Sequence, residues 1–247
     1  YYMMFLGNVV NRSPYTLEIF SVVLRLLQRN PDHVIYLRGT HECDDAWKQH
    51  TLQRELDLRA NNFSNNSIPV EKEIDTFFKT LPWTVYCTIP YIKENKLNYF
   101  KLAGFIENEH ILNMIDEPAY ASFLRSSKQN GIDFFELKYR NPLDPEAKNI
   151  VSRALVRGIK KRDSYEVMQG LRLMSPTKGT TTWTVFSSAA EPFRKALNFH
   201  HDAFTIIHSE KNLNDWKISL FNRDVLNKND LSFKETWFNF FSGEKIN

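Results

Sequence analysis

Cysteine is scarce in this chain, with only Cys43 and Cys87 among 247 residues. Two cysteines without CxxC spacing provide neither a disulfide framework nor a zinc-binding motif. Their small number favours a reducing environment, and we expect an intracellular, cytoplasmic location. We also expect no signal peptide, and the sequence has no apolar run near the ~20 residues of a membrane-spanning helix. We therefore expect no membrane insertion.

The chain also has almost no excess of positive over negative charge. The 32 Lys and Arg residues exceed the 29 Asp and Glu residues by only 3, and they are scattered along the chain rather than arranged in stripes. Nucleic-acid-binding proteins usually present a basic face, so we expect no nucleic-acid partner. The first residue is Tyr1 rather than Met, so we expect the sequence to be part of a longer protein.

Aromatic residues are plentiful, at 14% of the chain with 19 Phe. Because aromatic side chains are enriched at interface hot spots, some of them are expected to contact a protein partner. The candidates lie in a charged C-terminal tail, residues 225–247, and are Trp237, Phe238, Phe240 and Phe241. The alternative, that this tail covers its own domain, is equally open at this point.

The first forty residues have the pattern of a strand, a helix and a strand with short connections. Residues 1–8 form an apolar run that ends in a turn, and residues 33–39 form another. Between them, apolar residues recur at helical spacing, with Ser13 as a candidate N-cap and Pro14 at the first helical position. A strand–helix–strand unit of this kind predicts an α/β fold.

Further elements are expected along the rest of the chain. Helices are expected over the polar residues 43–62, over residues 70–82, where Pro82 ends the helix, and over the amphipathic residues 147–163. A hairpin is expected across the turn 93–96, formed by residues 83–92 and 96–105. Later strands are expected at 165–174, 180–188, 202–209 and 216–222.

Residues 5–42, FLGNVVNRSPYTLEIFSVVLRLLQRNPDHVIYLRGTHE, resemble the PPP family of serine/threonine protein phosphatases. The family has GDxVDRG, a helix, a strand and GNHE in the same order. Later segments parallel the family's CHGG, RAHQ and LFSAPNYCGEFDN motifs in sequence order. The resemblance extends over roughly residues 1–222 and begins after the family's first motif, GDxHG.

This resemblance implies the metallophosphoesterase (calcineurin-like) fold, an α/β sandwich of two mixed β-sheets flanked by helices. The first strand and the GDxHG segment would be missing from the sequence as given. The phosphatase-like domain would comprise residues 1–224, followed by the aromatic tail. Members of the family use two metal ions that polarise a water molecule for attack on phosphorus.

The motif positions nearest the N-terminus are partly substituted. The bridging aspartate of GDxVDRG falls on Asn8, the aspartate that orients the catalytic histidine falls on Asn11, and the metal-binding asparagine of GNHE falls on Thr40. The retained family positions are Arg12, Arg38, His41 and Glu42. Arg12 and His41 have two interpretations, because they could bind phosphate or could hold the two turns together.

The later motifs have lost their ligands as well. The histidine of CHGG falls on Ala103, the arginine of RAHQ on Gln169 and the histidine of RAHQ on Leu171. Alanine and leucine side chains cannot bind a metal ion. The resemblance therefore implies a phosphatase fold without its metal centre, and we expect no metal cofactor and no catalytic residue.

The interpretation favoured by these substitutions is a pseudophosphatase that serves as a structural or scaffolding subunit in a multi-subunit protein assembly. One alternative is a residual or altered phosphatase, with Mn or Zn/Fe bound if residues before Tyr1 restore ligands. Another is a module that binds phosphate or phosphopeptides through Arg12 and Arg38 without cleaving them.

Overall fold

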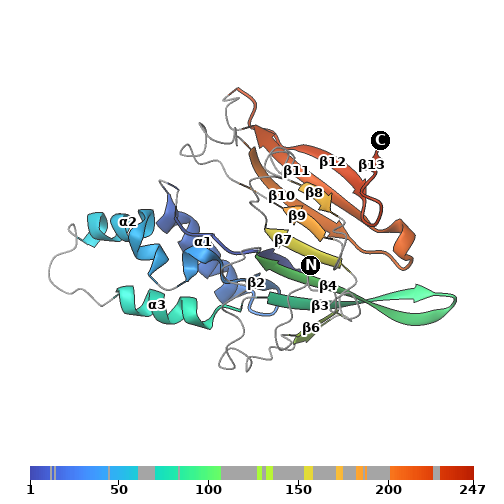
Figure 1. The fold of residues 1–247 in the computed structure, drawn as a ribbon, viewed down its shortest axis with the longest axis horizontal. Coiled ribbons are helices and arrows are strands. Elements are labelled where there is room, and N and C mark those ends of the chain that lie inside the picture. Colours follow the sequence, from blue (N-terminus) through green and yellow to red (C-terminus); the bar gives the residue numbers. More distant parts are fainter. Residues whose placement is uncertain are drawn as a thin grey trace.

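The computed structural model describes residues 1–11, 13, 15–43, 45–60, 70–82, 84–106, 127–129, 132–135, 153–157, 171–174, 182–185, 187, 201–224 and 229–247. Within these ranges the chain has a mixed α/β architecture (Figure 1). In this described part of the chain, the three α-helices gather on one side, and a four-stranded sheet lies on the opposite side. No helix within the described ranges is long and apolar enough to cross a membrane.

The expected strand–helix–strand unit is confirmed at the N-terminus. Strands β1 (Met3–Phe5) and β2 (Val34–Tyr36) are parallel neighbours, and helix α1 (Thr16–Arg29) connects them. Helix α1 buries Phe20 and Val23, where they join an apolar cluster with residues from α2 and α3. The three-residue strands are shorter than expected, and they form a separate two-stranded sheet.

The start of α1 differs from the prediction of a local cap. The helix begins at Thr16, after the expected positions, and Pro14 lies outside the described residues. Ser13 Oγ accepts a hydrogen bond from Tyr15 N at 3.1 Å. The first helical N–H groups, of Thr16 and Leu17, donate instead to the Glu55 carboxylate at 3.0 and 2.9 Å. A distant carboxylate thus satisfies the donors that the sequence assigned to Ser13.

The polar helix expected at 43–62 is divided in two. A 3₁₀ turn, η2 (Ala46–Gln49), precedes helix α2 (Thr51–Ala60). His50 lies between them in an extended conformation, with φ −130° and ψ −158°. The third helix, α3 (Val70–Thr80), matches the prediction over 70–82, and it ends just before Pro82 as that residue requires.

A seven-stranded sheet forms the largest part of the fold. Its strand order is β5-β6-β3-β4-β7-β9-β8, with parallel and antiparallel neighbours. The short strands are β5 (Ser127–Gln129), β6 (Ile132–Phe135), β7 (Arg153–Arg157), β8 (Leu171–Met174) and β9 (Thr182–Val185). The mixed sheet agrees with the expected fold class.

The hairpin expected around residues 93–96 is present as β3 (Thr84–Lys93) and β4 (Lys96–Ile106). Glu94 and Asn95 form its turn, with φ of 52° and 59°, as a two-residue turn of this type requires. The helix expected over 147–163 is wrong at its centre, because Arg153–Arg157 is strand β7. Its residues pair with both β4 and β9, and those pairings outweigh a helical spacing carried by few apolar residues.

The four-stranded sheet is antiparallel and has the order β10-β11-β12-β13. It contains β10 (His201–His208), β11 (Lys217–Asp224), β12 (Lys234–Asn239) and β13 (Lys245–Ile246). The 3₁₀ turn η6 (Leu213–Asp215) connects β10 to β11. Residues 234–246, expected as part of an appended tail, are therefore two strands of a sheet that begins before residue 225.

The two larger sheets share one apolar core. Trp183 from β9, Phe100 from β4 and Ile218 from β11 are buried in a single cluster with Phe240. Trp183 Nε1 donates a hydrogen bond to the Phe240 backbone oxygen at 2.9 Å. Phe240, which follows β12, thus packs between the two sheets and joins the last strands to β4 and β9.

Candidate functional site

The loops that carry the phosphatase-like residues lie side by side at one end of β1 and β2. Because the two strands are parallel neighbours, the segments that follow them emerge at the same sheet edge. Residues 7–11 follow β1 and residues 37–43 follow β2. The structure therefore brings together the two N-terminal motifs of the sequence.

Glu42 is the centre of this arrangement. Its side chain is completely buried at the end of the 3₁₀ turn η1 (Thr40–Glu42). Oε1 accepts hydrogen bonds from Val9 N at 2.7 Å, Val10 N at 3.3 Å and the Tyr36 hydroxyl at 2.8 Å. Oε2 accepts hydrogen bonds from Asn8 N at 2.9 Å and Gly39 N at 2.8 Å. Five donors compensate the buried carboxylate, which fixes both loops in one conformation.

The hydroxyl of Tyr36 belongs to the same network. Burial and the neighbouring Glu42 carboxylate raise the pKa of Tyr36 well above its usual value. Tyr36 therefore remains a neutral donor to Glu42 at any physiological pH. Tyr36 is the last residue of β2, so its hydrogen bond anchors the Glu42 carboxylate to the sheet.

Asn8 has a constrained backbone and a fully used side-chain oxygen. Its φ is 52°, in the left-handed region that asparagine tolerates better than most residues. Oδ1 accepts hydrogen bonds from Thr40 Oγ1 at 3.0 Å and from His41 N at 3.0 Å. An amide oxygen has two lone pairs, so the protein itself occupies both. The position expected to bridge two metals is thus a hydrogen-bond acceptor that joins the two loops.

Two glycines allow this close approach of the loops. A Cβ atom on Gly39 would overlap the backbone N and Oδ1 of Asn8 and would lie 2.5 Å from Glu42 Oε2. A Cβ atom on Gly7 would lie 2.7 Å from Gly39 Cα, and Gly7 also has a φ of 85°. Any larger residue at Gly39 would therefore push apart the groups that define the site.

Asn11 is directed toward helix α2. Its side chain is buried, and its Oδ1 accepts a hydrogen bond from Leu52 N at 3.0 Å, in the first turn of α2. Among the described residues, its Nδ2 has no hydrogen-bond partner. The oxygen that an aspartate would use to orient a histidine serves here as a helix cap.

His41 is held by the backbone of the first loop. Its Nδ1 lies 3.1 Å from the Val10 carbonyl oxygen, and its ring centroid lies 5.5 Å from that of His50. The contact of Nδ1 with the Val10 carbonyl fixes the orientation of the His41 ring against the first loop.

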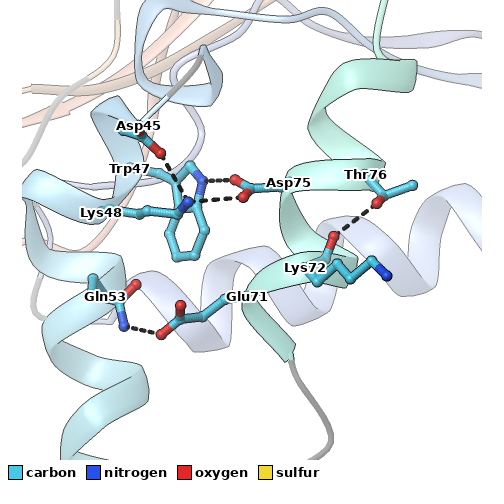
Figure 2. A network of polar contacts seen from close by, with 8 residues as sticks. All are labelled: Asp45, Trp47, Lys48, Gln53, Glu71, Lys72, Asp75 and Thr76. Atoms are coloured by element: carbon cyan, nitrogen blue, oxygen red, sulfur yellow. Dashed lines mark hydrogen bonds and ion pairs between the residues drawn. The ribbon is translucent and has the colours of Figure 1, made fainter.

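A hollow of about 460 Å³ lies beside this histidine pair at the start of α2. Residues with polar or charged side chains line it, namely Lys48, Gln49, His50, Thr51, Gln53, Arg54 and Asp57. Figure 2 shows that the Lys48 ammonium is already engaged, because Nζ lies 2.8 Å from Asp45 Oδ1 and 2.8 Å from Asp75 Oδ2. These hydrogen bonds to Asp45 and Asp75 raise the pKa of Lys48 above its usual range. The positive charge of Lys48 is therefore balanced by these two carboxylates of the same chain.

The same network anchors η2 to α3. Asp75 also accepts a hydrogen bond of 2.7 Å from Nε1 of the buried Trp47 (Figure 2). Partial burial works against ionisation of Asp75, but the hydrogen bonds from Lys48 and Trp47 outweigh it and lower the pKa of this carboxyl. A second contact, from Gln53 Nε2 to Glu71 Oε1 at 2.7 Å, joins α2 to α3.

Of the other expected site positions, Arg38 lies in the second loop, and two positions of the later motifs lie on separate strands. Arg38 is buried, with Nε 3.4 Å from the Glu42 backbone oxygen. Ala103 lies in β4 opposite Ala154 of β7, whereas Leu171 lies in β8 opposite Val185 of β9. Since β7 and β9 separate β4 from β8, these two positions are not on neighbouring strands. Arg12 and Gln169 lie outside the described residues.

The aromatic candidates for partner binding pack on their own domain. Phe240 is completely buried, and Phe238 and Phe241 pack partly buried against the same core. Trp237 is half-buried and its ring centroid lies 4.6 Å from that of His208. The fully buried ring of Phe240 has no surface to offer a partner, because it fills the space between the sheets.

Two structural residues of this region escaped the sequence analysis. Glu55, which caps α1, and Tyr36, which donates to Glu42, belong to no phosphatase motif. A carboxylate in the interior of the helix predicted over 43–62 gives no local sign of a bond to another helix, so only the fold reveals Glu55. Tyr36 carried a weak signal, as a hydroxyl that ends an otherwise apolar strand.

Comparison with known proteins gives a distant structural likeness. No family model matches the chain, and no curated protein matches it. Among solved structures, it is similar to a protein serine/threonine phosphatase from Saccharomyces cerevisiae with similarity to human phosphatase PP5. The sequence identity is 13% and the TM-score 0.49, over 94% of this chain and 73% of that chain. A likeness of this size shows neither family nor activity.

Proposed function

We propose that this chain is a catalytically inactive, PPP-phosphatase-like subunit that contributes to a protein assembly through its surface. Its fold would be the metallophosphoesterase sandwich, for which the mixed sheet, the second sheet and the flanking helices are the support. The observation that carries the proposal is the occupation of Asn8 Oδ1 by two protein donors, Thr40 and His41.

A two-metal centre does not fit the residues present. Such a centre needs an anionic oxygen between the ions, but position 8 offers a neutral amide whose lone pairs are used. Thr40 points its hydroxyl hydrogen at Asn8, so it too is part of the internal network. Within the described ranges, no group of three or more His, Cys, Asp and Glu side chains is arranged to hold a metal ion.

Hydrogen bonds within the protein hold the two loops together. The carboxylate of Glu42 collects four backbone N–H groups and one hydroxyl. A retained Glu42 and a retained His41 are therefore explained by their structural bonds, and catalysis is not needed to account for them. This supports a fold preserved for its shape.

The test is metal content together with phosphatase activity. The purified 247-residue chain would be incubated with Mn²⁺ or with Zn²⁺, desalted, and examined by elemental analysis and with p-nitrophenyl phosphate. We expect metal stoichiometry near zero and no turnover above buffer. One or two tightly held ions per chain, with turnover abolished in His41→Ala, would overturn the proposal.

The matched variant is Asn8→Asp, which can keep both hydrogen bonds to Oδ1 while adding a negative charge. We expect it to fold and to remain inactive, because the positions of Ala103 and Leu171 still supply no ligand. In cells that lack this protein, a His41→Ala chain of normal stability should restore the phenotype as well as the wild-type chain does. A phenotype restored only by chains with His41 would contradict a non-catalytic role.

A further inference from the structure

Helix α1 has a second apolar stripe, on the side that faces solvent. Tyr15 directly before the helix, Ile19 and Val22 follow each other at spacings of four and three residues, and their exposed fractions are 65%, 39% and 57%. Leu26, four residues later, is half-buried. Residues at these spacings lie above one another on one face of a helix. The stripe is therefore continuous along the whole length of α1.

This stripe is separate from the face that α1 uses to pack in its own domain. Phe20 and Val23 are almost fully buried and belong to the cluster shared with α2 and α3. A surface helix usually has one apolar face, which packs on the core, and a polar face on the opposite side. A helix with an additional exposed apolar row indicates an interaction surface.

Charged residues border the stripe on one side only. Glu18 and Arg25 are exposed and lie seven residues apart on that side, and Arg29 lies one turn further. Glu18 is ion-paired with Arg59 of α2, and both side chains remain about half exposed, at 50% and 53%. The border of the stripe therefore has the Glu18–Arg59 pair near its start and the basic groups of Arg25 and Arg29 near its end.

We propose that α1 packs against the α1 helix of a second copy of this chain, in an antiparallel two-fold arrangement. With the axis between Ile19 and Val22, Ile19 of one copy packs on Val22 of the other, and Tyr15 packs on Leu26. Because of the two-fold symmetry, the Ile19–Val22 contact and the Tyr15–Leu26 contact each form twice, as an isologous interface requires. The inference goes beyond the proposed function, since it does not depend on the state of the phosphatase-like loops.

The charge pattern is what selects a second copy as the occupant. In an antiparallel helix pair, the residues beside the apolar seam on the same side face each other across the axis. Here that brings Glu18 of each copy near Arg25 of the other, which is an attractive contact formed twice. In a parallel pair, these charges would face the opposite border of the partner's stripe. Thr16 and Val23 on that border are buried in their own domain, so neither charge would gain a partner.

The dimer should be weak, because one pair of 14-residue helices buries less surface than a standard interface of roughly 1,600 Å². The first measurement is sedimentation equilibrium of the full chain from about 1 to 500 µM, which brackets micromolar dissociation constants. We expect a reversible monomer–dimer equilibrium. A chain that stays monomeric over the whole range would overturn the proposal, whether or not α1 binds another protein.

Variants then locate the interface. Val22→Glu places a charge in the seam and should weaken dimerisation by about tenfold or more, which corresponds to ~1.4 kcal/mol. The matched control is Gln28→Glu, which adds the same charge to an exposed position of α1 outside the stripe. Val22→Lys is the second variant and should behave like Val22→Glu. Dimerisation equal in Val22→Glu and Gln28→Glu would place the interface elsewhere and overturn the assignment.

A charge exchange tests the antiparallel register. Arg25→Glu places a second carboxylate near Glu18 of the other copy and should weaken the dimer by a few-fold, roughly the effect of two exposed ion pairs. Combining it with Glu18→Arg should restore most of the lost affinity. No loss in Arg25→Glu, or no recovery in the double variant when its melting temperature is unchanged, would contradict this register.

Discussion

Tyr36 donates its hydroxyl hydrogen to Glu42 over 2.8 Å, in a part of the interior where the Glu42 side chain is completely buried and Tyr36 nearly so. The tyrosine ends β2, and the glutamate ends the 3₁₀ turn that follows four residues later. Through this bond the sheet holds the carboxylate, and the carboxylate in turn holds both loops.

Replacing Glu42 by Gln should destabilise the protein strongly. The amide would present an N–H₂ group to donors that now meet a carboxylate oxygen, leaving several of them unsatisfied in a buried site. We expect the free energy of unfolding to fall by about 2–4 kcal/mol, measured by urea denaturation. Tyr36→Phe removes one of the five bonds and should cost only ~1 kcal/mol. Equal losses in the two variants would show that Glu42 is not the common acceptor.

Replacing Gly39 by Ala should separate the two loops. The added methyl would overlap Asn8 and lie 2.5 Å from Glu42 Oε2, so the backbone must shift or the hydrogen bonds must break. We expect a loss of at least ~2 kcal/mol in thermal or chemical denaturation. Gly243→Ala is a useful comparison, because Gly243 has a φ of 74° in the turn between β12 and β13. It should cost only about 1 kcal/mol.

The Asp75 carboxyl should make stability depend on pH in the acid range. Its pKa in the folded protein lies below the ordinary value of 3.8, so the ionised form is favoured by folding. The contribution is therefore fully present above about pH 4 and is lost as the pH falls through the lowered pKa. Between about pH 5 and pH 2, the free energy of unfolding should therefore fall less in Asp75→Asn than in the wild-type chain. An unchanged acid slope in this variant would contradict the assignment.

Truncating Phe240 should damage the core, although this residue lies close to the C-terminus. Phe240 contacts Trp183 and Trp216 through ring packing and is completely buried. We expect Phe240→Ala to lower the free energy of unfolding by ~3–5 kcal/mol. The control is Phe233→Ala, whose side chain is 42% exposed, and it should cost well under half as much. A small effect at Phe240 would mean that the last strands attach loosely to the sandwich.

Local patterns in the sequence predicted several elements of the fold correctly. Helix α1 has apolar residues at helical spacing, and the β3–β4 hairpin has two alternating runs around a short polar turn, so each carries its own signal. Strand β7 was predicted as a helix because Ala154, Leu155 and Val156 are too few to distinguish the two periods. Its strand conformation depends on β4 and β9, which lie far away in the sequence.

The sequence analysis selected residues of these two loops but could not predict the hydrogen bonds between them. Asn8, His41 and Glu42 were selected from the resemblance, and the structure brings them together. The bonds that give them roles are between residues 32 to 34 positions apart, and no local pattern encodes such pairings. For the same reason, the cap that Glu55 provides for α1, 39 positions away, could not be read from either helix alone.

The carboxylate of Glu42 also sets how these loops open. The amide hydrogens of Asn8, Val9, Val10 and Gly39 all share one acceptor group, so none can be exposed to solvent for long while the others remain bound. Hydrogen–deuterium exchange at these four sites should follow a single rate, set by release of the side chain from its pocket. The two loops would then open and close together, as one cooperative unit, even though a 14-residue helix separates them in the chain.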